Sequence, residues 1–171
     1  LASWGVPVSV DTYKPAVMRA ALEAGATMIN DITGMISPEA LSVVAESDCA
    51  VCVMHMQGEP GTMQQAPQYQ NVVAEVRSFL TDAVERCRQA GIADQRIVVD
   101  PGFGFGKTLN HNLDLFSALT VAGVGELPIL VGLSRKSMLG VITGRAVGER
   151  LAGSVAAALL AAQKKKKILR V

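Results

Sequence analysis

The sequence has few aromatic residues and almost no net charge. Only 4% of its 171 residues are aromatic, whereas 50% are hydrophobic, so we expect a core of Val, Ile, Leu and Ala. The formal net charge is +1 at pH 7. Such a chain has no strong electrostatic field, which argues against a nucleic acid or an anionic membrane as partner.

The sequence also lacks a long apolar run. The longest, Leu151–Ala162, is interrupted by Gly153 and Ser154 and is shorter than the ~20 residues that cross a bilayer. No signal-peptide pattern precedes the first predicted strand, so we expect neither a membrane span nor secretion. The three cysteines form an odd set without the spacing of a disulfide framework, which favours a reducing, cytoplasmic location.

We expect no cysteine or histidine metal site. Cys49 and Cys52 have C-x-x-C spacing, but they enter a predicted strand instead of opening a helix. Their side chains would point to opposite faces of that strand, which disfavours zinc binding and redox chemistry. The two histidines, His55 and His111, are too few for a histidine cluster, and His55 is interpreted as a packed residue.

Aliphatic runs alternate regularly with helical patterns along the chain. We predict strands at 6–10, 27–32, 50–55, 96–100, 128–133 and 167–171. We predict helices at 15–23, 38–46, 71–90, 111–122 and 148–163, a short helical piece from Ser134, and Ser37 as an N-cap. The polar segment Gln57–Gln70 is long for a loop in a compact domain, so we expect it to cover a site.

This alternation predicts an α/β fold with a parallel sheet. A complete eight-fold barrel needs roughly 250 residues, so we expect a TIM (β/α)8 barrel of which this chain covers about six βα units. The chain begins at Leu1 without Met and stops inside a predicted strand at Val171. We therefore expect a single barrel domain over residues 1–171 that is truncated at both ends.

Polar side chains stand where the predicted strands end. Asp11, Asn30 and Asp100 each close an aliphatic run, and Lys136 lies shortly after the fifth strand. The carboxyl ends of parallel strands form the rim at which an α/β barrel assembles its active site. We therefore expect an enzyme that binds a polar, planar heterocycle at this rim.

A glycine-rich turn follows Asp100 but matches no phosphate-binding pattern. The Walker pattern would need glycine at Pro101, and the dinucleotide pattern would need glycine at Lys107. We expect a βα turn whose small residues let Phe105 lean over the site, where an aromatic contact would suit a flat ring.

Six motifs together carry a family resemblance. They are Ser9–Thr12, Ile29–Ile32, Met54–Gln57, Asp100–Lys107, Ser134–Ser137 and Arg150–Ser154. Through them, essentially the whole chain resembles the bacterial dihydropteroate synthases of folate biosynthesis. The resemblance implies a TIM barrel that uses Mg²⁺ and condenses 6-hydroxymethyl-7,8-dihydropterin pyrophosphate with 4-aminobenzoate to give 7,8-dihydropteroate and pyrophosphate. It also implies a homodimer, with sulfonamides as competitive mimics of 4-aminobenzoate.

The resemblance assigns roles to particular residues. The pterin-binding set is Asp11, Asn30, Ile32, Met54, Asp100, Gly132, Lys136 and Arg170. The aminobenzoate-binding set is Phe105, Lys136 and Ser137, with Arg170 also on pyrophosphate and with Lys136, Arg170 and Asp100 as the catalytic residues. Asp100 would accept paired N–H bonds from the pterin, and Arg170 would stack on its face. Ser137 would receive the aminobenzoate carboxylate at a helix start.

Each assignment has an ordinary structural alternative. Asp100 could cap its own turn, Asp11 could cap the following helix, and Lys136 could be a solvated surface lysine. We interpret Asp31 as a turn or capping residue and Arg135 as structural.

The chain departs from the family pattern in three ways. The first two βα units are missing, and with them the strand-one Asn that binds magnesium and two closing loops, so no metal ligand is expected within this chain and the fragment alone could be inactive. The family's His after Arg-Val falls beyond Val171. The run Lys164–Lys167 replaces a small-residue turn, and we expect it to lie at a helix C-terminus, where cations are favoured.

For the reaction we expect a dissociative, SN1-like substitution without a general base, because the arylamine is free near neutral pH. Asp100 and Asp11 would stabilise a cation on the pterin, and Arg170 would neutralise the leaving group. Three other functions remain open. They are an aldolase-like barrel with Lys136 as Schiff-base nucleophile, a pterin-dependent methyl-carrier domain and a non-catalytic pterin-binding fragment.

Overall fold

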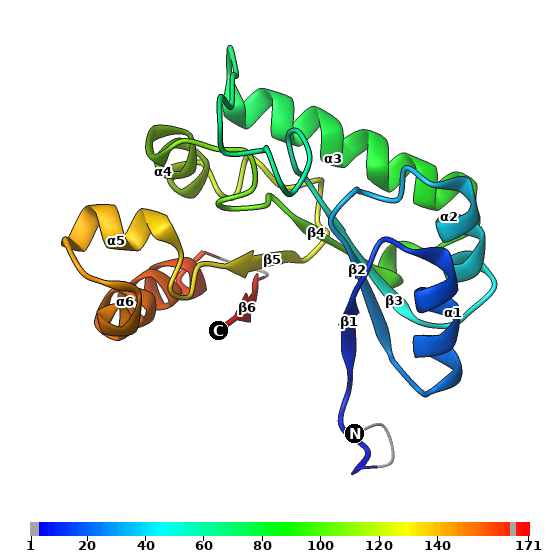
Figure 1. Ribbon diagram of the computed structural model, residues 1–171. Helices are drawn as coiled ribbons and strands as arrows, with labels where there is room; N and C mark the ends of the chain where they lie inside the picture. The colour runs from blue at the N-terminus through cyan, green and yellow to red at the C-terminus, as the bar shows by residue number, and fades with distance from the viewer. Residues whose placement is uncertain (1–3, 165–166) are drawn as a thin grey trace.

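The protein is described by a computed structural model, which covers residues 4–164 and 167–171. Its strands form one six-stranded sheet in the order β1-β2-β3-β4-β5-β6, with every neighbouring pair parallel. The helices lie outside this curled sheet (Figure 1). The predicted α/β class with a parallel, barrel-like sheet is confirmed.

The strands are short, and four of the six begin one to three residues later than the sequence pattern predicts. They are β1 (Ser9–Asp11), β2 (Met28–Asp31), β3 (Ala50–Met54), β4 (Ile97–Asp100), β5 (Ile129–Gly132) and β6 (Lys167–Arg170). The predicted start of the first strand at Val6 is wrong, since Pro7 has no N–H to donate to a neighbouring strand. The predicted carboxyl ends, which matter for the site, lie within two residues of the observed ones.

Six α-helices in the described residues connect and cover the strands. They are α1 (Pro15–Glu23), α2 (Pro38–Ala45), α3 (Val72–Gln89), α4 (Leu109–Ser117), α5 (Ser137–Thr143) and α6 (Leu151–Ala162). The predicted N-cap is confirmed, because Ser37 accepts a hydrogen bond from Ala40 N–H at 3.3 Å.

The bounds of α4 and α6 differ most from the prediction, and α4 ends at Ser117, five residues before the predicted Ala122. Helix α4 begins at Leu109, not His111, because Thr108 and His111 form a reciprocal capping box. Helix α6 begins at Leu151, not Gly148, because Val147–Glu149 forms a separate 3₁₀ turn.

The two faces of the sheet carry different side chains. On the outer face, Val51, Val53 and Val99 belong to a large aliphatic core with the helices. On the inner face, Cys52, Val98 and Leu130 form a small apolar cluster. Alternate residues of a strand point to opposite faces of the sheet. The next inward-facing residue beyond each of these three, toward the carboxyl end of its strand, therefore lies at the rim.

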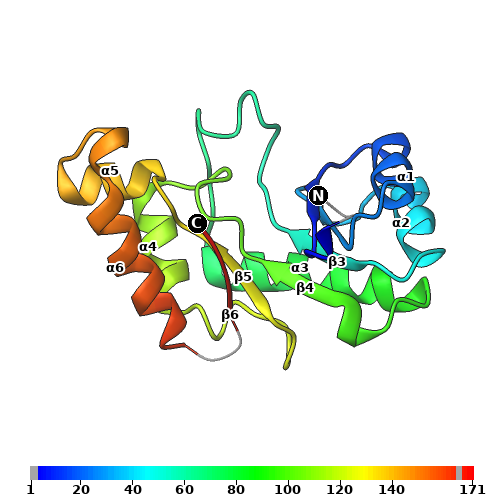
Figure 2. The same ribbon diagram turned by 90° about the horizontal axis from the view of Figure 1, so that it is seen from below.

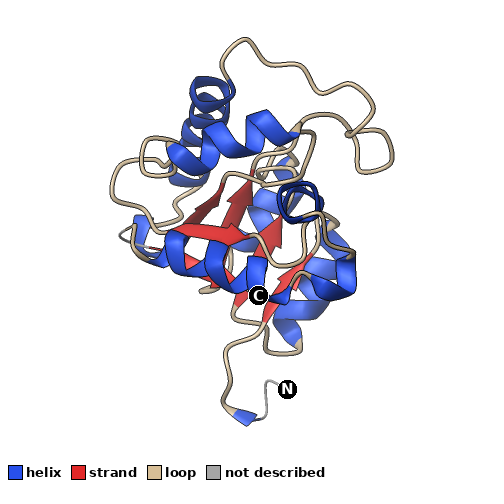
Figure 3. Cartoon of the chain, turned by 90° about the vertical axis from the view of Figure 1, so that its left-hand side faces the viewer, coloured by secondary structure: helices blue, strands red, loops and turns tan. Residues whose placement is uncertain are grey.

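The arrangement of helices leaves the sheet open between its end strands. Figure 2 shows α4, α5 and α6 gathered beside β5 and β6, whereas α1 and α2 lie beside the first strands. Figure 3 shows the strands grouped in the centre with helices around them. The outer surface of α6 is apolar and exposed at Leu151, Val155 and Leu159. No helix within the described ranges is long and apolar enough to span a membrane.

Candidate functional site

Polar side chains from both halves of the sheet meet inside the rim. Arg170 on β6 places Nη2 3.4 Å from Oδ2 of Asp100 on β4 and Nη1 3.8 Å from Oδ2 of Asp11 on β1. Asn30 on β2 donates from Nδ2 to Oδ1 of Asp11 at 2.9 Å. The structure therefore brings together four of the predicted pterin-binding residues.

Asp100 is as enclosed as Asn30, at 1% exposure, and more so than the other two members of this group. Its Oδ1 accepts the N–H of Gly102 at 2.7 Å, and its Oδ2 faces Arg170. Burial raises the pKa of Asp100, while the Gly102 N–H, Arg170 and Lys136 act in the opposite direction. Asp100 thus does cap its own turn, and it keeps a second oxygen on the inner face.

Asn30 carries an unsatisfied acceptor. The residue is 1% exposed, and its Oδ1 is buried with no hydrogen-bond partner among the described residues. Leaving such an atom unpaired costs roughly 1–3 kcal/mol, so it marks a place where a ligand donor would bind. Asp11 is exposed and bonds Asn30, whereas α1 starts after Lys14 without a side-chain cap. The interpretation of Asp11 as a helix cap is therefore wrong.

Asp31 has a structural role, as interpreted. Its Oδ1 accepts the N–H of Thr33 and its Oδ2 accepts the N–H of Met35, both at 2.8 Å. Met35 is buried with φ +56°, a left-handed conformation that these bonds support. Asp31 therefore shapes the turn after β2 and does not face the pterin side.

The glycine-rich turn after β4 is packed too tightly for other residues. Gly102 has φ +69°, and a Cβ there would lie 1.9 Å from the carbonyl oxygen of His55. Phe103 is fully buried, whereas Phe105 is only partly buried. Phe103 therefore anchors the turn in the core, and Phe105 is the aromatic ring left at the rim.

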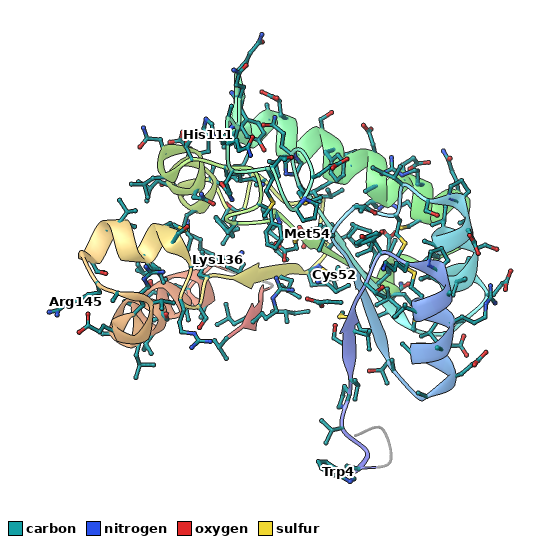
Figure 4. The ribbon with its side chains drawn as sticks, in the orientation of Figure 1. Trp4, Cys52, Met54, His111, Lys136 and Arg145 are labelled. Carbon is teal, nitrogen blue, oxygen red and sulfur yellow. The ribbon has the colours of Figure 1, made fainter. Side chains whose placement is uncertain are left out.

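Lys136 reaches the same turn from the loop after β5. Its ammonium donates to the carbonyl oxygen of Phe103 and lies 4.7 Å from the centre of the Phe105 ring. Burial lowers the pKa of Lys136 to about 8, Asp100 opposes this shift and Arg170 adds to it. The alternative of a freely solvated lysine is wrong. Figure 4 shows Lys136 near the end of β5, far from Arg145 on the loop after α5.

The loop that carries Lys136 is braced from α6. Arg135 has φ +54°, its N–H bonds Ser154 Oγ at 3.0 Å, and its carbonyl accepts from Arg150 at 2.9 Å. These contacts agree with the interpretation of Arg135 as structural. They also explain the Arg150–Ser154 motif, which holds a strained turn next to Lys136.

The remaining predicted residues occupy varied positions. Gly132 leaves room for Arg170, because a Cβ there would lie 3.1 Å from its Nε. Met54 is fully buried on the inner face below the turn. Ile32 lines a hollow of about 200 Å³ beside Asp11. Ser137 is exposed at the first position of α5, where nothing tests its predicted role.

Two functional candidates were missed from the sequence. Lys107 is 3% exposed, and its ammonium bonds two carbonyls of the glycine-rich turn and Nδ1 of His55. Asn112, 3% exposed, accepts the N–H of Gly104 at 2.8 Å. The sequence does show that Lys107 lies between the glycine-rich turn and the residue that caps the next helix. It does not show whether such a lysine is buried or solvated.

The structure also locates the cysteines and the lysine run. Cys49 belongs to the outer core and Cys52 to the inner cluster, which confirms that they face opposite sides. Burial raises the pKa of the Cys52 thiol. Lys164 follows α6 and donates to the carbonyl of Ser117 at 3.1 Å. Lys165 and Lys166, part of the same prediction, lie outside the described residues. The prediction is wrong for Lys167, which begins β6.

A resident magnesium ion does not fit the residues in hand. Among residues 4–164 and 167–171, no three His, Cys, Asp or Glu side chains gather into a possible metal site. Asp11 and Asp100 are each paired with Arg170. The Mg²⁺ cofactor stays a prediction.

Comparison with known proteins agrees with this geometry. The pterin binding enzyme family matches residues 1–171. The chain is 49% identical to the dihydropteroate synthase of Escherichia coli K12 over 164 residues, which cover 96% of this chain and 58% of that protein. The chain therefore spans less than two thirds of the length of this relative.

Two solved structures are also similar. The dihydropteroate synthase of Burkholderia cenocepacia complexed with 7,8-dihydropteroate has a TM-score of 0.90 and 49% identity, covering 98% of this chain and 63% of that one. The Yersinia pestis dihydropteroate synthase with a sulfonamide drug has a TM-score of 0.95 and 45% identity, covering 100% and 62%. By sequence over its whole length and by fold, this chain belongs to the pterin binding enzyme family.

Proposed function

We propose that this chain forms the pterin-binding part of a dihydropteroate synthase, a transferase that joins 6-hydroxymethyl-7,8-dihydropterin pyrophosphate to 4-aminobenzoate. The observation that carries the proposal is the buried Asp100 carboxylate, which faces Arg170 inside the rim beside the unsatisfied oxygen of Asn30. The dihydropteroate and sulfonamide complexes of two similar enzymes support it.

On binding, the pterin would replace hydrogen bonds and ion pairs that the rim side chains make with each other in the structure. Asp100 offers carboxylate oxygens to the paired N–H groups of the aminopyrimidine edge, a charge-assisted, bidentate arrangement. Asn30 offers its free Oδ1 to a further donor, and Lys136 can turn from the Phe103 carbonyl to a ring nitrogen or carbonyl of the pterin. Each of these side chains is thus held on a strand or on the loop that follows one before the ligand binds.

Charge placement supports a dissociative, SN1-like substitution. Departure of pyrophosphate leaves positive charge on the pterin methylene and ring, and the carboxylates of Asp100 and Asp11 would stabilise it. The guanidinium of Arg170 lies between these carboxylates and can stack on the pterin face while it neutralises the leaving group. The free amine of 4-aminobenzoate then forms the C–N bond with the methylene beside Phe105, and the proton that the amine loses goes to the released pyrophosphate or to water.

The other functions considered from the sequence have less support. A Schiff-base aldolase would need Lys136 free for covalent attack, but its ammonium bonds Phe103 and covers the Phe105 ring. A methyl-carrier domain and a non-catalytic pterin-binding fragment are not favoured either, because the similar proteins are dihydropteroate synthases.

The test uses the full-length protein that contains this chain, supplied with both substrates and Mg²⁺. Formation of 7,8-dihydropteroate is the expected result. Asp100→Asn should weaken dihydropterin binding by about 2–3 kcal/mol, because it replaces an acceptor by a donor at a buried site. Asp48→Asn, an exposed charge removal before β3, is the matched control. An active protein whose dihydropterin affinity is unchanged by Asp100→Asn would refute the assigned anchor.

A further inference from the structure

Lys107 lies beneath the glycine-rich turn, and the proposed reaction gives it no role. It is 3% exposed. Its ammonium donates to the carbonyl oxygen of Gly102 at 2.9 Å and to that of Phe105 at 3.0 Å, and it lies 2.9 Å from Nδ1 of His55. These contacts use all three N–H donors of the ammonium group, so none is left to bond another partner.

His55 fixes the ammonium to the sheet. The residue directly follows β3 and packs edge-on against Phe79 of α3, with ring centres 5.0 Å apart. Burial and the neighbouring Lys107 lower the pKa of His55 to about 3, so its ring is neutral near pH 7. A neutral ring whose Nδ1 accepts a hydrogen bond carries its proton on Nε2.

The two carbonyls that Lys107 bonds are the ends of the segment that presents Phe105. Within this segment Phe103 is buried in the core, and the N–H of Gly104 is held by Asn112. Because one ammonium bonds both carbonyls, it reinforces the backbone bond from Phe105 N–H to the Gly102 carbonyl and fixes the direction of both carbonyl groups. The exposed part of the Phe105 ring is therefore positioned from below by Lys107.

The residues proposed to bind the pterin do not depend on the hydrogen bonds of Lys107 in the same way. Asp100 and Asn30 lie on β4 and β2, and the ladder hydrogen bonds of the sheet fix their backbones. Phe105 lies in a turn with no strand partner. Its N–H donates to the Gly102 carbonyl at 3.1 Å, and beyond this one backbone bond its placement depends on side-chain contacts. A loss of Lys107 should therefore affect one half of the site more than the other.

We propose that Lys107 is a positioning residue for 4-aminobenzoate, acting through Phe105 and anchored by His55. This inference rests on the proposed function, since it names the substrate whose ring meets Phe105. Lys107 itself is buried below the turn, so the proposal gives it no direct contact with substrate.

The test is a double-mutant cycle of Lys107→Met and Phe105→Ala in the full-length protein. Lys107→Met keeps a long stem but removes every donor, and we expect KM for 4-aminobenzoate to rise about tenfold, with kcat and the dihydropterin Kd changed less than about threefold. In the Phe105→Ala background the same change should add less than about threefold, because residues that act through one another are not additive. Lys164→Met, away from the rim, is the control for loss of a lysine.

A second pair of variants covers the case in which Lys107→Met does not fold. His55→Phe keeps the contact with Phe79 but removes the acceptor, so KM for 4-aminobenzoate should rise; His55→Gln retains an acceptor and should restore it. An unchanged KM in folded Lys107→Met or His55→Phe, or losses that add in the cycle, would overturn the inference. A parent protein that forms no dihydropteroate would instead overturn the proposed function and, with it, the substrate named here.

Discussion

Arg170 Nη1 on β6 lies 3.8 Å from Asp11 Oδ2 on β1, although these strands form the two ends of the sheet. The same guanidinium contacts Asp100 on β4 through Nη2. The sheet must curl for its end strands to share one ion-pair network, and this network occupies the place that the proposed pterin would take. Arg170 thus links the barrel geometry to the proposed chemistry.

Replacing Arg170 by lysine tests whether its planar, two-sided contact matters. Arg170→Lys keeps the charge but cannot face both carboxylates or stack on a ring, so kcat/KM should fall by about tenfold or more. Arg145→Lys, at an exposed position on the loop after α5, should leave kcat/KM near that of the parent. Equal kcat/KM values for the two variants would contradict the role assigned to Arg170.

A methyl group at Gly102 should disrupt the turn. In Gly102→Ala the new Cβ would lie 1.9 Å from the carbonyl oxygen of His55 at a positive φ, so we expect a loss of about 3 kcal/mol or more of unfolding free energy. Gly61→Ala, where the Cβ meets nothing within 4 Å, should stay within about 0.5 kcal/mol. Denaturant titration of both variants checks this, and similar midpoints would contradict the packing described.

His55 should make the protein less stable in acid. Its pKa is lowered to about 3 in the folded state, mainly by burial, while the unfolded chain has the ordinary value of 6.5. Between these pH values only the unfolded chain binds the extra proton, so the stability contribution is lost as pH falls from 6.5 toward 3, at up to about 1.4 kcal/mol per pH unit.

The measurement is the unfolding free energy of the parent and of His55→Gln between pH 7 and pH 4. Glutamine cannot take up the proton, so the variant should show the shallower acid decline. Parallel curves for the two proteins would contradict this assignment.

Binding should be ordered, with the pterin and pyrophosphate before 4-aminobenzoate. The Lys136 ammonium is engaged with the Phe103 carbonyl and the Phe105 ring, so we expect the proposed aminobenzoate pocket to form only after the pterin draws Lys136 away. Calorimetry should detect weak or no binding of 4-aminobenzoate or a sulfonamide alone, and clear binding once a pterin and pyrophosphate are present. Tight binding to the free protein would rule out the order.

The 171-residue polypeptide by itself should form no dihydropteroate. Within the part of the chain that the structure describes, β1 and β6 each pair with one strand, and the outer surface of α6 exposes Leu151 and Leu159. Open edges and exposed apolar helices favour association over an ordered site. Product formation by the purified chain with both substrates and Mg²⁺ is the assay, and a rate within about tenfold of the full-length protein would contradict the expectation.

Several features could be predicted from local sequence alone. Helix α1 has the predicted bounds because Pro15 starts it and Gly25 follows its end, and Ser37 caps α2 as its position indicates. The polar residues Asp11, Asn30 and Asp100 lie near strand ends because aliphatic runs define the strands. The limits of α4 were misjudged, since the Thr108–His111 capping box depends on a side-chain geometry that composition does not reveal.

The sequence by itself determined the parallel α/β fold and the rim at which the site lies, because strand period, turn chemistry and helix caps act over a few residues. Only the tertiary structure decided that Arg170 lies between Asp11 and Asp100 and that Lys107 is buried against His55. These contacts join residues far apart along the chain. They follow from sheet curl and burial, which arise only when all the strands pack together.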